Sequence, residues 1–326
     1  MDTPSQWAEP LSDAWDEVAF PDVSDEQIAA IVGVHGLDVD LAAVERLPVL
    51  GAINTALALG DGYVLRVPKA IAQGVADTYA ESVAVPAARS AGVRTPALLV
   101  FDDSRTILNV PYTIYERVDG ENLGPRDLDP TVNGEIYRQL GRQLAVLHYG
   151  VSVCPDPNGW LDTPGRMEDP LPLLAQLVSD GILGELNVRW LEHVFDRLRP
   201  SVQQAQTFCR FLHNDVQPTN VLIKESAFAA LIDWGNAGWG DPGLEFTGIP
   251  ARAIPSSLAG YREVAPIDGD EAAEARILWD HLCSALRYLR RSPTPGSRLW
   301  RRPPAARLIE LLAASAQIPA WRQLLG

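Results

Sequence analysis

The feature that most constrains the fold is the segment at positions 211–242, FLHNDVQPTNVLIKESAFAALIDWGNAGWGDP, in which ionisable and amide side chains interrupt apolar runs. Polar side chains inside apolar segments are costly unless something pairs with them. NVLI and ALIDW predict two short paired strands around a turn near Lys224. Such a hairpin places Asn220 and Asp233 at the same open end, and Asp215 precedes Asn220 by five residues on the entering loop. We therefore expect two carboxylates and one carboxamide to cluster.

This cluster offers hard oxygen ligands, which suit Mg²⁺ and do not suit zinc. The alternative is that Asp215 and Asp233 only cap turns. Taken one at a time, either aspartate fits that alternative better. The set of three at this spacing favours the metal site.

The order of the expected elements indicates an α+β protein with two parts. Residues 45–118 read as a mostly antiparallel sheet with one inserted helix, with hairpin turns at Gly60–Gly62 and Asp102–Ser104. Beyond position 126 the apolar spacing becomes helical. We expect three regions: an acidic N-terminal arm at 1–20, an N-terminal lobe at 21–118, and a larger, mostly helical C-terminal lobe at 119–326.

Composition excludes several function classes. No apolar run reaches the roughly 18 to 20 residues of a membrane span, and the N-terminus lacks a signal-peptide pattern, so we expect a cytoplasmic protein without a membrane partner. The formal net charge of −15 disfavours nucleic acid as a partner. The three cysteines are far apart and form neither a disulfide framework nor a zinc pattern. Nothing in the sequence indicates an oligomeric state.

Three short motifs carry a resemblance to a known family: HNDVQPTN at 213–220, IDW at 232–234 and GDP at 240–242. In this order they resemble the aminoglycoside phosphotransferase family, whose members share the protein-kinase fold and include enzymes for macrolides, peptide antibiotics and hygromycin-type sugars. Weaker likeness extends over about positions 45–290. The resemblance implies a bilobal kinase-like fold with nucleotide bound to the sheet of the N-terminal lobe.

The resemblance also implies roles for the clustered residues. In kinases the loop aspartate accepts the proton of the substrate hydroxyl, and an asparagine and a second aspartate hold magnesium. Carried over, Asp215 is the catalytic base, and Asn220 and Asp233 are the Mg²⁺ ligands. His213 is expected to brace the loop by hydrogen bonds, and Asp241 to anchor a loop. The phosphoryl donor is expected to be ATP or GTP.

The nucleotide contacts implied by the resemblance lie in the first lobe. In the strand GYVLRVPK, alternation puts Val64 and Arg66 on one face, so Arg66 takes the place of the family's usual lysine and Val64 lies under the adenine. Arginine binds phosphate as a planar fork. The alternative is a surface arginine on an edge strand. Glu81, on the following helix, is expected to pair with this strand cation.

Two further segments complete the expected nucleotide site. Residues 51–55 fit a turn that covers the phosphates, where Asn54 or Thr55 could donate to a phosphate oxygen. Residues 115–120 fit the hinge between lobes, and the adenine is expected to bond the backbone near Glu116 and Val118.

The acceptor is indicated only by charge and aromatic residues. Acidic residues between 241 and 280, among them Asp268, Asp270 and Glu271, suggest a cationic acceptor, although they also fit an ordinary acidic helix start. Trp234 and Trp239 could stack on an acceptor ring or belong to the core.

The predicted function is transfer of the γ-phosphate of ATP or GTP to a hydroxyl of an antibiotic-like, aminated and polyhydroxylated acceptor, as in antibiotic resistance or self-resistance. One alternative is a metabolic small-molecule kinase of the choline, homoserine or methylthioribose kind. The other is a kinase-like nucleotide-binding protein without turnover.

Overall fold

The chain forms two compact units in the computed structural model, which describes residues 18–48, 53–124, 130–165, 168–291 and 305–325. The N-terminal unit runs to Pro86 and resumes at Pro96–Val118, and the C-terminal unit comprises Ala87–Thr95 and Asp119–Gly326. Nearly all of the expected acidic arm lies outside the described residues. Within the described ranges, no helix is both long and apolar enough to cross a bilayer.

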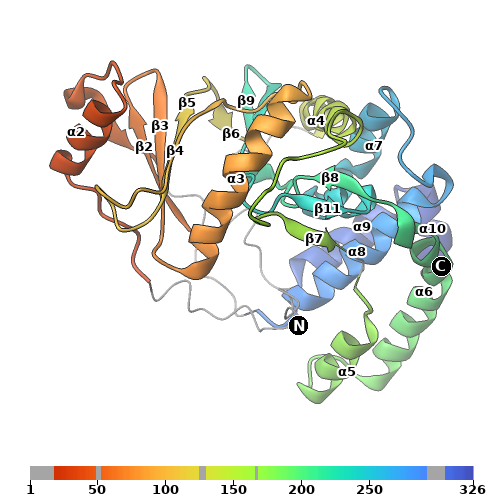
Figure 1. Cartoon of the computed structure of the whole chain (residues 1–326). Helices are drawn as coiled ribbons and strands as arrows, with labels where there is room; N and C mark the ends of the chain where they lie inside the picture. The colour runs from red at the N-terminus through yellow and green to blue at the C-terminus, as the bar shows by residue number, and fades with distance from the viewer. Residues whose placement is uncertain (1–17, 49–52, 125–129, 166–167, 292–304, 326) are drawn as a thin grey trace. The chain divides into compact units, whose positions relative to one another are not determined.

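The N-terminal unit is built on a five-stranded antiparallel sheet in the order β1-β2-β3-β5-β4 (Figure 1). Its strands and helices are α2 (Asp25–Val34), η1 (Leu41–Ala43), β1 (Val44–Arg46), β2 (Asn54–Leu59), β3 (Tyr63–Pro68), α3 (Ala72–Ser90), β4 (Leu98–Asp102) and β5 (Tyr112–Glu116).

The two hairpins of this sheet turn differently. Gly60 has a φ of 63°, the left-handed conformation that a tight turn needs and glycine adopts without strain, so the predicted turn between β2 and β3 is present. The second predicted hairpin is present as β4 and β5, but its connection spans residues 103–111, so the predicted turn at Asp102–Ser104 is only the start of a longer loop. Its start is held by Asp102, whose carboxylate accepts hydrogen bonds from the Ser104 amide and the Tyr112 hydroxyl.

Helix α2 and one face of the sheet form the core of the N-terminal unit. Ser24 caps the helix in a capping box with Gln27, as a serine before an apolar helical pattern predicts. Ile31 is fully buried and belongs to the same apolar cluster as Leu65 and Val67 of β3. This alternation leaves the side chains between them on the opposite face of the strand.

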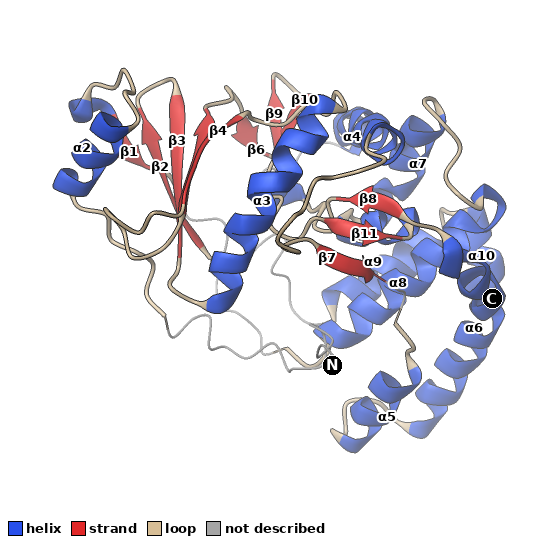
Figure 2. Cartoon of the chain, in the orientation of Figure 1, coloured by secondary structure: helices blue, strands red, loops and turns tan. Residues whose placement is uncertain are grey.

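The C-terminal unit is mostly helical, with two small three-stranded sheets (Figure 2). The sheets have the orders β10-β9-β6 and β7-β11-β8. The elements are β6 (Glu121–Asn122), α4 (Pro130–Gly150), β7 (Asp162–Gly165), α5 (Leu171–Ser179), α6 (Glu185–Gln204), η2 (Ala205–Thr207), β8 (Arg210–Leu212), η3 (Pro218–Asn220), β9 (Val221–Lys224), β10 (Ala227–Leu231), β11 (Gly238–Gly240), η4 (Pro242–Gly248), η5 (Ala251–Ala253), α7 (Ile254–Arg262), η6 (Asp270–Ala272), α8 (Ala273–Tyr288), α9 (Ala306–Ser315) and α10 (Pro319–Leu325).

Helices α4 and α7 pack with their backbones in direct contact. A Cβ atom at Gly141 would lie 1.9 Å from the Ser257 carbonyl oxygen, and one at Gly260 would lie 1.9 Å from the Arg138 carbonyl oxygen. Glycine therefore permits this approach, which brings the middle of α4 into contact with α7.

Residues 87–95 belong to the C-terminal unit. The sequence predicted a single boundary between the two parts, after residue 118, so this segment is a correction to that prediction. The reason is hydrogen bonding across a long sequence separation. The Arg94 carbonyl accepts from the Leu231 amide, and the Arg94 guanidinium donates to the Phe228 carbonyl. The end of α3 and the turn after it are thereby fixed to the β10 strand.

Candidate functional site

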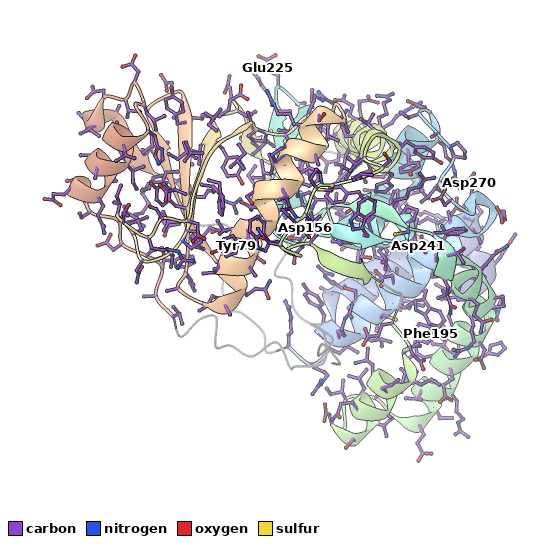
Figure 3. The ribbon with its side chains drawn as sticks, viewed as in Figure 1. Tyr79, Asp156, Phe195, Glu225, Asp241 and Asp270 are labelled. Carbon is purple, nitrogen blue, oxygen red and sulfur yellow. The ribbon has the colours of Figure 1, made fainter. Side chains whose placement is uncertain are left out.

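The predicted hairpin is present as β9 and β10, with Glu225 at its tip (Figure 3). Asn220 ends η3 and leads into β9, and its carbonyl accepts a hydrogen bond from the Ile232 amide. Asp233 follows directly and has a φ of 71°, a conformation that aspartate tolerates better than most residues. The hairpin thus brings Asn220 and the start of the Asp233 loop to one end.

Asp215 is held through one of its two carboxylate oxygens. The Asn220 side-chain amide donates to Asp215 Oδ2 at 2.8 Å and to the Asp215 carbonyl at 2.9 Å, and Gln217 donates to the same Oδ2 at 3.0 Å. Among the residues that the structure describes, none donates to Asp215 Oδ1. Burial and the negative charge of Asp233 raise the pKa of Asp215 to about 7. One oxygen is therefore fixed, and the other can receive a proton from a hydroxyl.

The residues predicted to hold magnesium fit a divalent cation. Both hydrogens of the Asn220 amide are directed at Asp215, so its Oδ1 faces away, and no side chain or amide within the described ranges donates to that oxygen. Asp233 lies close enough for its charge to act on Asp215, so a cation here would offset repulsion between two carboxylates. One or two protein oxygens beside substrate phosphates is the usual Mg²⁺ environment. No cluster of three or more His, Cys, Asp or Glu ligands occurs in the described part of the chain.

His213 is fully buried and braces the loop, the role the sequence predicted. Its Nδ1 lies 3.2 Å from the Asp215 amide, which can only donate, and its Nε2 lies 3.0 Å from the Ile232 carbonyl, which can only accept. These partners fix the neutral tautomer with the proton on Nε2. Burial lowers the pKa of His213, which also favours the neutral ring. Because both ring nitrogens are already hydrogen-bonded to the backbone, the His213 ring positions the loop and does not transfer a proton to a substrate.

Glu245 supports the same loop, and sequence reasoning missed it. Its carboxylate is buried in η4 and accepts hydrogen bonds from the amides of His213 and Asn214, both at 2.8 Å. His148 of α4 lies 3.2 Å from Glu245 and 3.0 Å from the hydroxyl of Tyr261 on α7. The only signal in the sequence is a lone carboxylate between Leu and Phe just after the GDP motif.

Asp241 anchors a turn. Its carboxylate accepts from the Gly243 amide at the start of η4 and lies 3.0 Å from Nε of the buried Arg276 (Figure 3). Burial raises the pKa of Asp241, and the charge of Arg276 acts against this. Both side chains are buried, so this pair shapes the C-terminal unit.

The prediction that Trp234 offers a stacking face is wrong, because its side chain is only 1% exposed. The indole nitrogen donates to the Thr95 hydroxyl at 3.0 Å, and the ring packs edge-on against His213. Trp239 is half-buried and packs edge-on against Phe211. Its contact with an acceptor stays a prediction.

Most of the acidic residues proposed to attract a cationic acceptor are already paired with arginines. Arg210 donates two hydrogen bonds to Asp268, at 2.7 and 2.9 Å, and Arg262 donates to Asp270 at 2.8 Å. Glu271 is exposed. Because two of the three carboxylates are already neutralised by arginines, the charge argument for a cationic acceptor loses most of its basis.

On the N-terminal unit, the expected ion pair is present. Arg66 Nη1 lies 2.5 Å from Glu81 Oε1, and the Tyr115 hydroxyl donates to Glu81 Oε2 at 2.5 Å. The Arg66 side chain is 16% exposed, so the alternative of an edge-strand surface arginine is wrong. Val64 is half-buried on the same face of β3, as alternation predicted.

The expected phosphate-covering turn is only partly described, since residues 51 and 52 lie outside the described ranges. Asn54 is half-buried at the start of β2. Thr55 is fully buried, and its hydroxyl donates to the Pro21 carbonyl at 3.1 Å, so the prediction that it donates to a phosphate is contradicted. Lys69, just after β3, is also buried, and its ammonium lies 4.2 Å from the centre of the Phe20 ring.

Some backbone amides of the expected hinge are already hydrogen-bonded within the protein. The Glu116 amide donates to the Ala97 carbonyl, and the Arg117 amide donates to the Gly62 carbonyl. Within the described part of the chain, the Val118 amide has no acceptor. Of the two hinge residues predicted from the sequence, Val118 therefore has the donor that remains for a ligand.

Comparison with known proteins gives a family and a fold. A model described as the phosphotransferase enzyme family matches residues 45–262. The search of curated proteins finds no match.

The similar solved structures include both aminoglycoside kinases and a choline kinase relative. A mutant of aminoglycoside 2′-phosphotransferase IIIa in its GDP complex is 18% identical, with a TM-score of 0.59 and coverage of 92% of this chain and 98% of that one. A choline/ethanolamine kinase family protein from Mesorhizobium loti is 17% identical, with a TM-score of 0.59 and coverage of 92% and 96%. The streptomycin–ATP complex of APH(2″)-IIa is 15% identical, with a TM-score of 0.56 and coverage of 82% and 91%. At these identities the neighbours show the shared fold alone, and they confirm the predicted kinase-like α+β class.

Proposed function

Because the chain belongs to the phosphotransferase enzyme family, we propose that it transfers the γ-phosphoryl group of ATP or GTP to a hydroxyl of a small-molecule acceptor. The observation that carries the proposal is the arrangement of Asp215, whose Oδ2 is fixed by Asn220 while Oδ1 is left to a hydroxyl. The structural neighbours hold GDP or ATP, which supports a nucleotide as the donor.

In the proposed reaction, Asp215 Oδ1 accepts the proton of the acceptor hydroxyl. The hydroxyl oxygen forms a bond to the γ-phosphorus as the bond between that phosphorus and the β–γ bridging oxygen breaks, and the nucleoside diphosphate leaves with the electron pair. Asn220 Oδ1 and the Asp233 carboxylate would hold Mg²⁺, which when bound neutralises the charge of the phosphates. Such reactions depend mainly on positioning and charge.

The N-terminal unit is proposed to bind the nucleotide. Arg66 would contact the α- and β-phosphates, with Glu81 fixing its guanidinium as it does in the ion pair. Val64 would pack under the base, and the Val118 amide and the Glu116 carbonyl would bond its edge. Asn54 would donate to a phosphate oxygen.

Two acceptor classes remain, antibiotics and metabolites. Aminoglycoside phosphotransferases and a choline/ethanolamine kinase family protein occur side by side among the neighbours. The pairing of Asp268 with Arg210 and of Asp270 with Arg262 weakens the case for an aminated antibiotic. We therefore favour a small metabolite acceptor, with an antibiotic as the alternative and with the cytoplasm as the site of action.

The test is a phosphoryl-transfer assay with ATP and GTP over a panel of hydroxylated antibiotics and common metabolites, followed by mass spectrometry of the products. We expect one compound to gain a phosphoryl group, and we expect removal of Mg²⁺ by a chelator to stop the transfer. Nucleotide binding without turnover of any panel compound would favour the non-catalytic alternative. Transfer that persists undiminished after chelation would reject the metal ligands.

A further inference from the structure

A cavity of about 100 Å³ lies within the C-terminal unit, next to the catalytic loop. Gln217 and Pro218, which follow Asp215 on that loop, form one wall of it. Tyr137 of α4, Thr247 of η4 and His281 of α8 contribute to the others. A group bound in this cavity would therefore lie beside the loop that carries the proposed catalytic base.

The charge of the cavity wall is opposite to that of the protein as a whole. The chain carries a formal net charge of −15, yet the charged side chains lining the cavity are Arg252, Arg307 and Glu310. Arg252 and Glu310 form an ion pair at 2.5 Å. One guanidinium, that of Arg307, is left without a carboxylate within 4 Å among the residues that the structure describes.

Arg307 is held in place by neutral groups. Its Nη1 donates to the Ser284 hydroxyl at 2.9 Å, and its guanidinium lies 3.8 Å from the centre of the Tyr288 ring. These contacts use one of its five donor hydrogens and one face. Burial lowers the pKa of Arg307, and the negative charges of Asp215 and Glu310 are among those that act in the other direction. The Arg307 side chain is half-buried. A guanidinium that is partly removed from water stays charged and is stabilised by an anionic partner.

We propose that Arg307 binds an anionic group of the acceptor, so that the acceptor is a small hydroxylated carboxylic acid. This inference rests on the proposed phosphotransferase function and names its substrate class. The carboxylate would receive the free guanidinium hydrogens, and Gln217 and Thr247 offer further polar contacts in the same cavity. The hydroxyl would then lie toward Asp215, on the loop that forms the adjoining wall.

The size of the cavity agrees with a small acceptor. Sites for drug-sized ligands measure roughly 300–1,000 Å³. The cavity of about 100 Å³ in the C-terminal unit lies below that range, which agrees with an acceptor smaller than a drug-sized antibiotic.

The test compares hydroxy acids with neutral diols of the same length: glycolate with ethylene glycol, glycerate with glycerol, and 4-hydroxybutyrate with 1,4-butanediol. Choline serves as the cationic compound. Binding to the full chain is measured by calorimetry or thermal protection, and phosphoryl transfer is measured separately with ATP and GTP. We expect at least one hydroxy acid to bind at least tenfold more tightly than its diol and than choline.

The variants are Arg307→Gln, Arg307→Lys and, as a matched control, Arg291→Gln. Arg291 also lies over the Tyr288 ring, at 4.1 Å, but it is exposed and does not line the cavity. We expect Arg307→Gln to remove the preference for the acid, Arg307→Lys to keep part of it, and Arg291→Gln to keep all of it. Thermal unfolding of each variant shows whether a lost preference for the acid comes from misfolding. If Arg307→Gln does not fold, the preference measured for Arg307→Lys decides whether Arg307 binds the carboxylate.

The two readouts separate the two proposals. Equal binding of acids and diols by the unmodified protein, or an unchanged preference in Arg307→Gln, would overturn the carboxylate inference even if phosphoryl transfer to another compound is observed. Selective binding of an acid that depends on Arg307, without transfer of phosphate to any compound, would support the inference and count against the proposed function.

Discussion

The two units hold their proposed functional residues in different ways. In the N-terminal unit, Arg66 is fixed by Glu81, 15 residues away, and Tyr115 completes the set from the neighbouring strand β5. In the C-terminal unit, the loop of Asp215 is fixed by Glu245, about 30 residues away along the chain, and Glu245 is held in turn by His148 of α4, about 100 residues from it. The difference is that the first site is supported by its own residues, whereas the second is supported by buried groups that would never touch a ligand.

This difference predicts different responses to mutation. Removing a residue of the Arg66–Glu81 pair should alter ligand binding and stability together, because the same side chains serve both. In the C-terminal unit the two should separate. Asp215 should matter for turnover alone, and Glu245 should matter first for the folded state.

The largest expected effect is that of Asp215→Asn. The amide keeps the size of the side chain and its position beside Asn220, but it cannot accept the hydroxyl proton. We expect turnover to fall by at least about 10²-fold, the low end for a positioned base. The affinity for ATP or GTP should change by less than about twofold, because the base contacts the acceptor. Steady-state kinetics and nucleotide titrations measure both, and near-normal turnover would remove Asp215 from its role.

The second effect concerns Glu245→Gln. The substitution replaces one acceptor oxygen by an NH₂ group that faces a backbone amide, so one of the two loop amides loses its partner. An unsatisfied buried group costs about 1–3 kcal/mol, and we expect the free energy of unfolding in denaturant to fall by that amount. The matched control is Glu263→Gln on the surface, where pairs with Arg138 and Arg142 are screened by solvent and should contribute little to stability. Equal losses in the two variants would show that the buried support is unimportant.

The same variant should change the dependence of stability on pH. Burial raises the pKa of Glu245, but hydrogen bonds from His148 and from the His213 amide lower it further than burial raises it. A carboxylate with a lowered pKa contributes stability above its unfolded pKa and loses that contribution as the pH falls below it. We therefore expect the stability of the parent to decline below about pH 4.5 more steeply than that of Glu245→Gln. Denaturant melts between pH 3 and 7 would reveal parallel curves if Glu245 does not contribute.

The sequence predicted the local features and missed the distant ones for the same reason. The β9–β10 hairpin and the capped helix α2 follow from patterns within about twenty residues, and the Arg66–Glu81 pair follows from the resemblance to kinases over a similarly short stretch. Glu245 and Trp234 could not be placed in this way, because their partners His148 and Thr95 come from other elements. Their burial depends on how α4, α7 and residues 87–95 pack, and a single sequence does not record that packing.

The position of Arg307 shows the same limit. The last forty residues of the sequence are rich in arginine and follow an acidic segment, whose net charge alone suggests attraction of a cation. Packing of α9 instead brings one of those arginines into the wall of the cavity, while Asp268 and Asp270 meet other arginines. Net charge describes the whole surface, but recognition depends on which charges remain unpaired at one place.

In the N-terminal unit, Arg66→Ala should raise the KM for the nucleotide by at least about tenfold, since a charged hydrogen bond contributes about 1.5–3 kcal/mol. Glu81 would lose this cation while the Tyr115 hydroxyl still donates to it, so stability should fall as well. Arg46→Ala on β1 is the control, because its pair with the exposed Asp22 lies at the surface. Parallel measurements of KM and of the unfolding free energy test the claim. A change in one without the other would contradict the view that this pair serves both binding and folding.

The smallest effect is expected for Asp270→Asn, and it tests the cationic acceptor directly. Asp270, near the start of α8 (Figure 3), is paired with Arg262, which also donates two hydrogen bonds to Glu274. Arg262 therefore keeps an anionic partner after the substitution, and an exposed ion pair contributes only about 0–1 kcal/mol. We expect the KM for the acceptor to change by less than about twofold. The KM of the variant and the KM of the parent should depend on salt to the same extent between low and physiological ionic strength.

If Asp270 instead holds a cationic acceptor, the KM would rise severalfold in the variant. The affinity of the parent for the acceptor would then weaken with salt, whereas the affinity of the variant would not. The comparison with Arg307→Gln then decides which sign of charge the acceptor carries, because the two variants are expected to move the same KM by very different amounts.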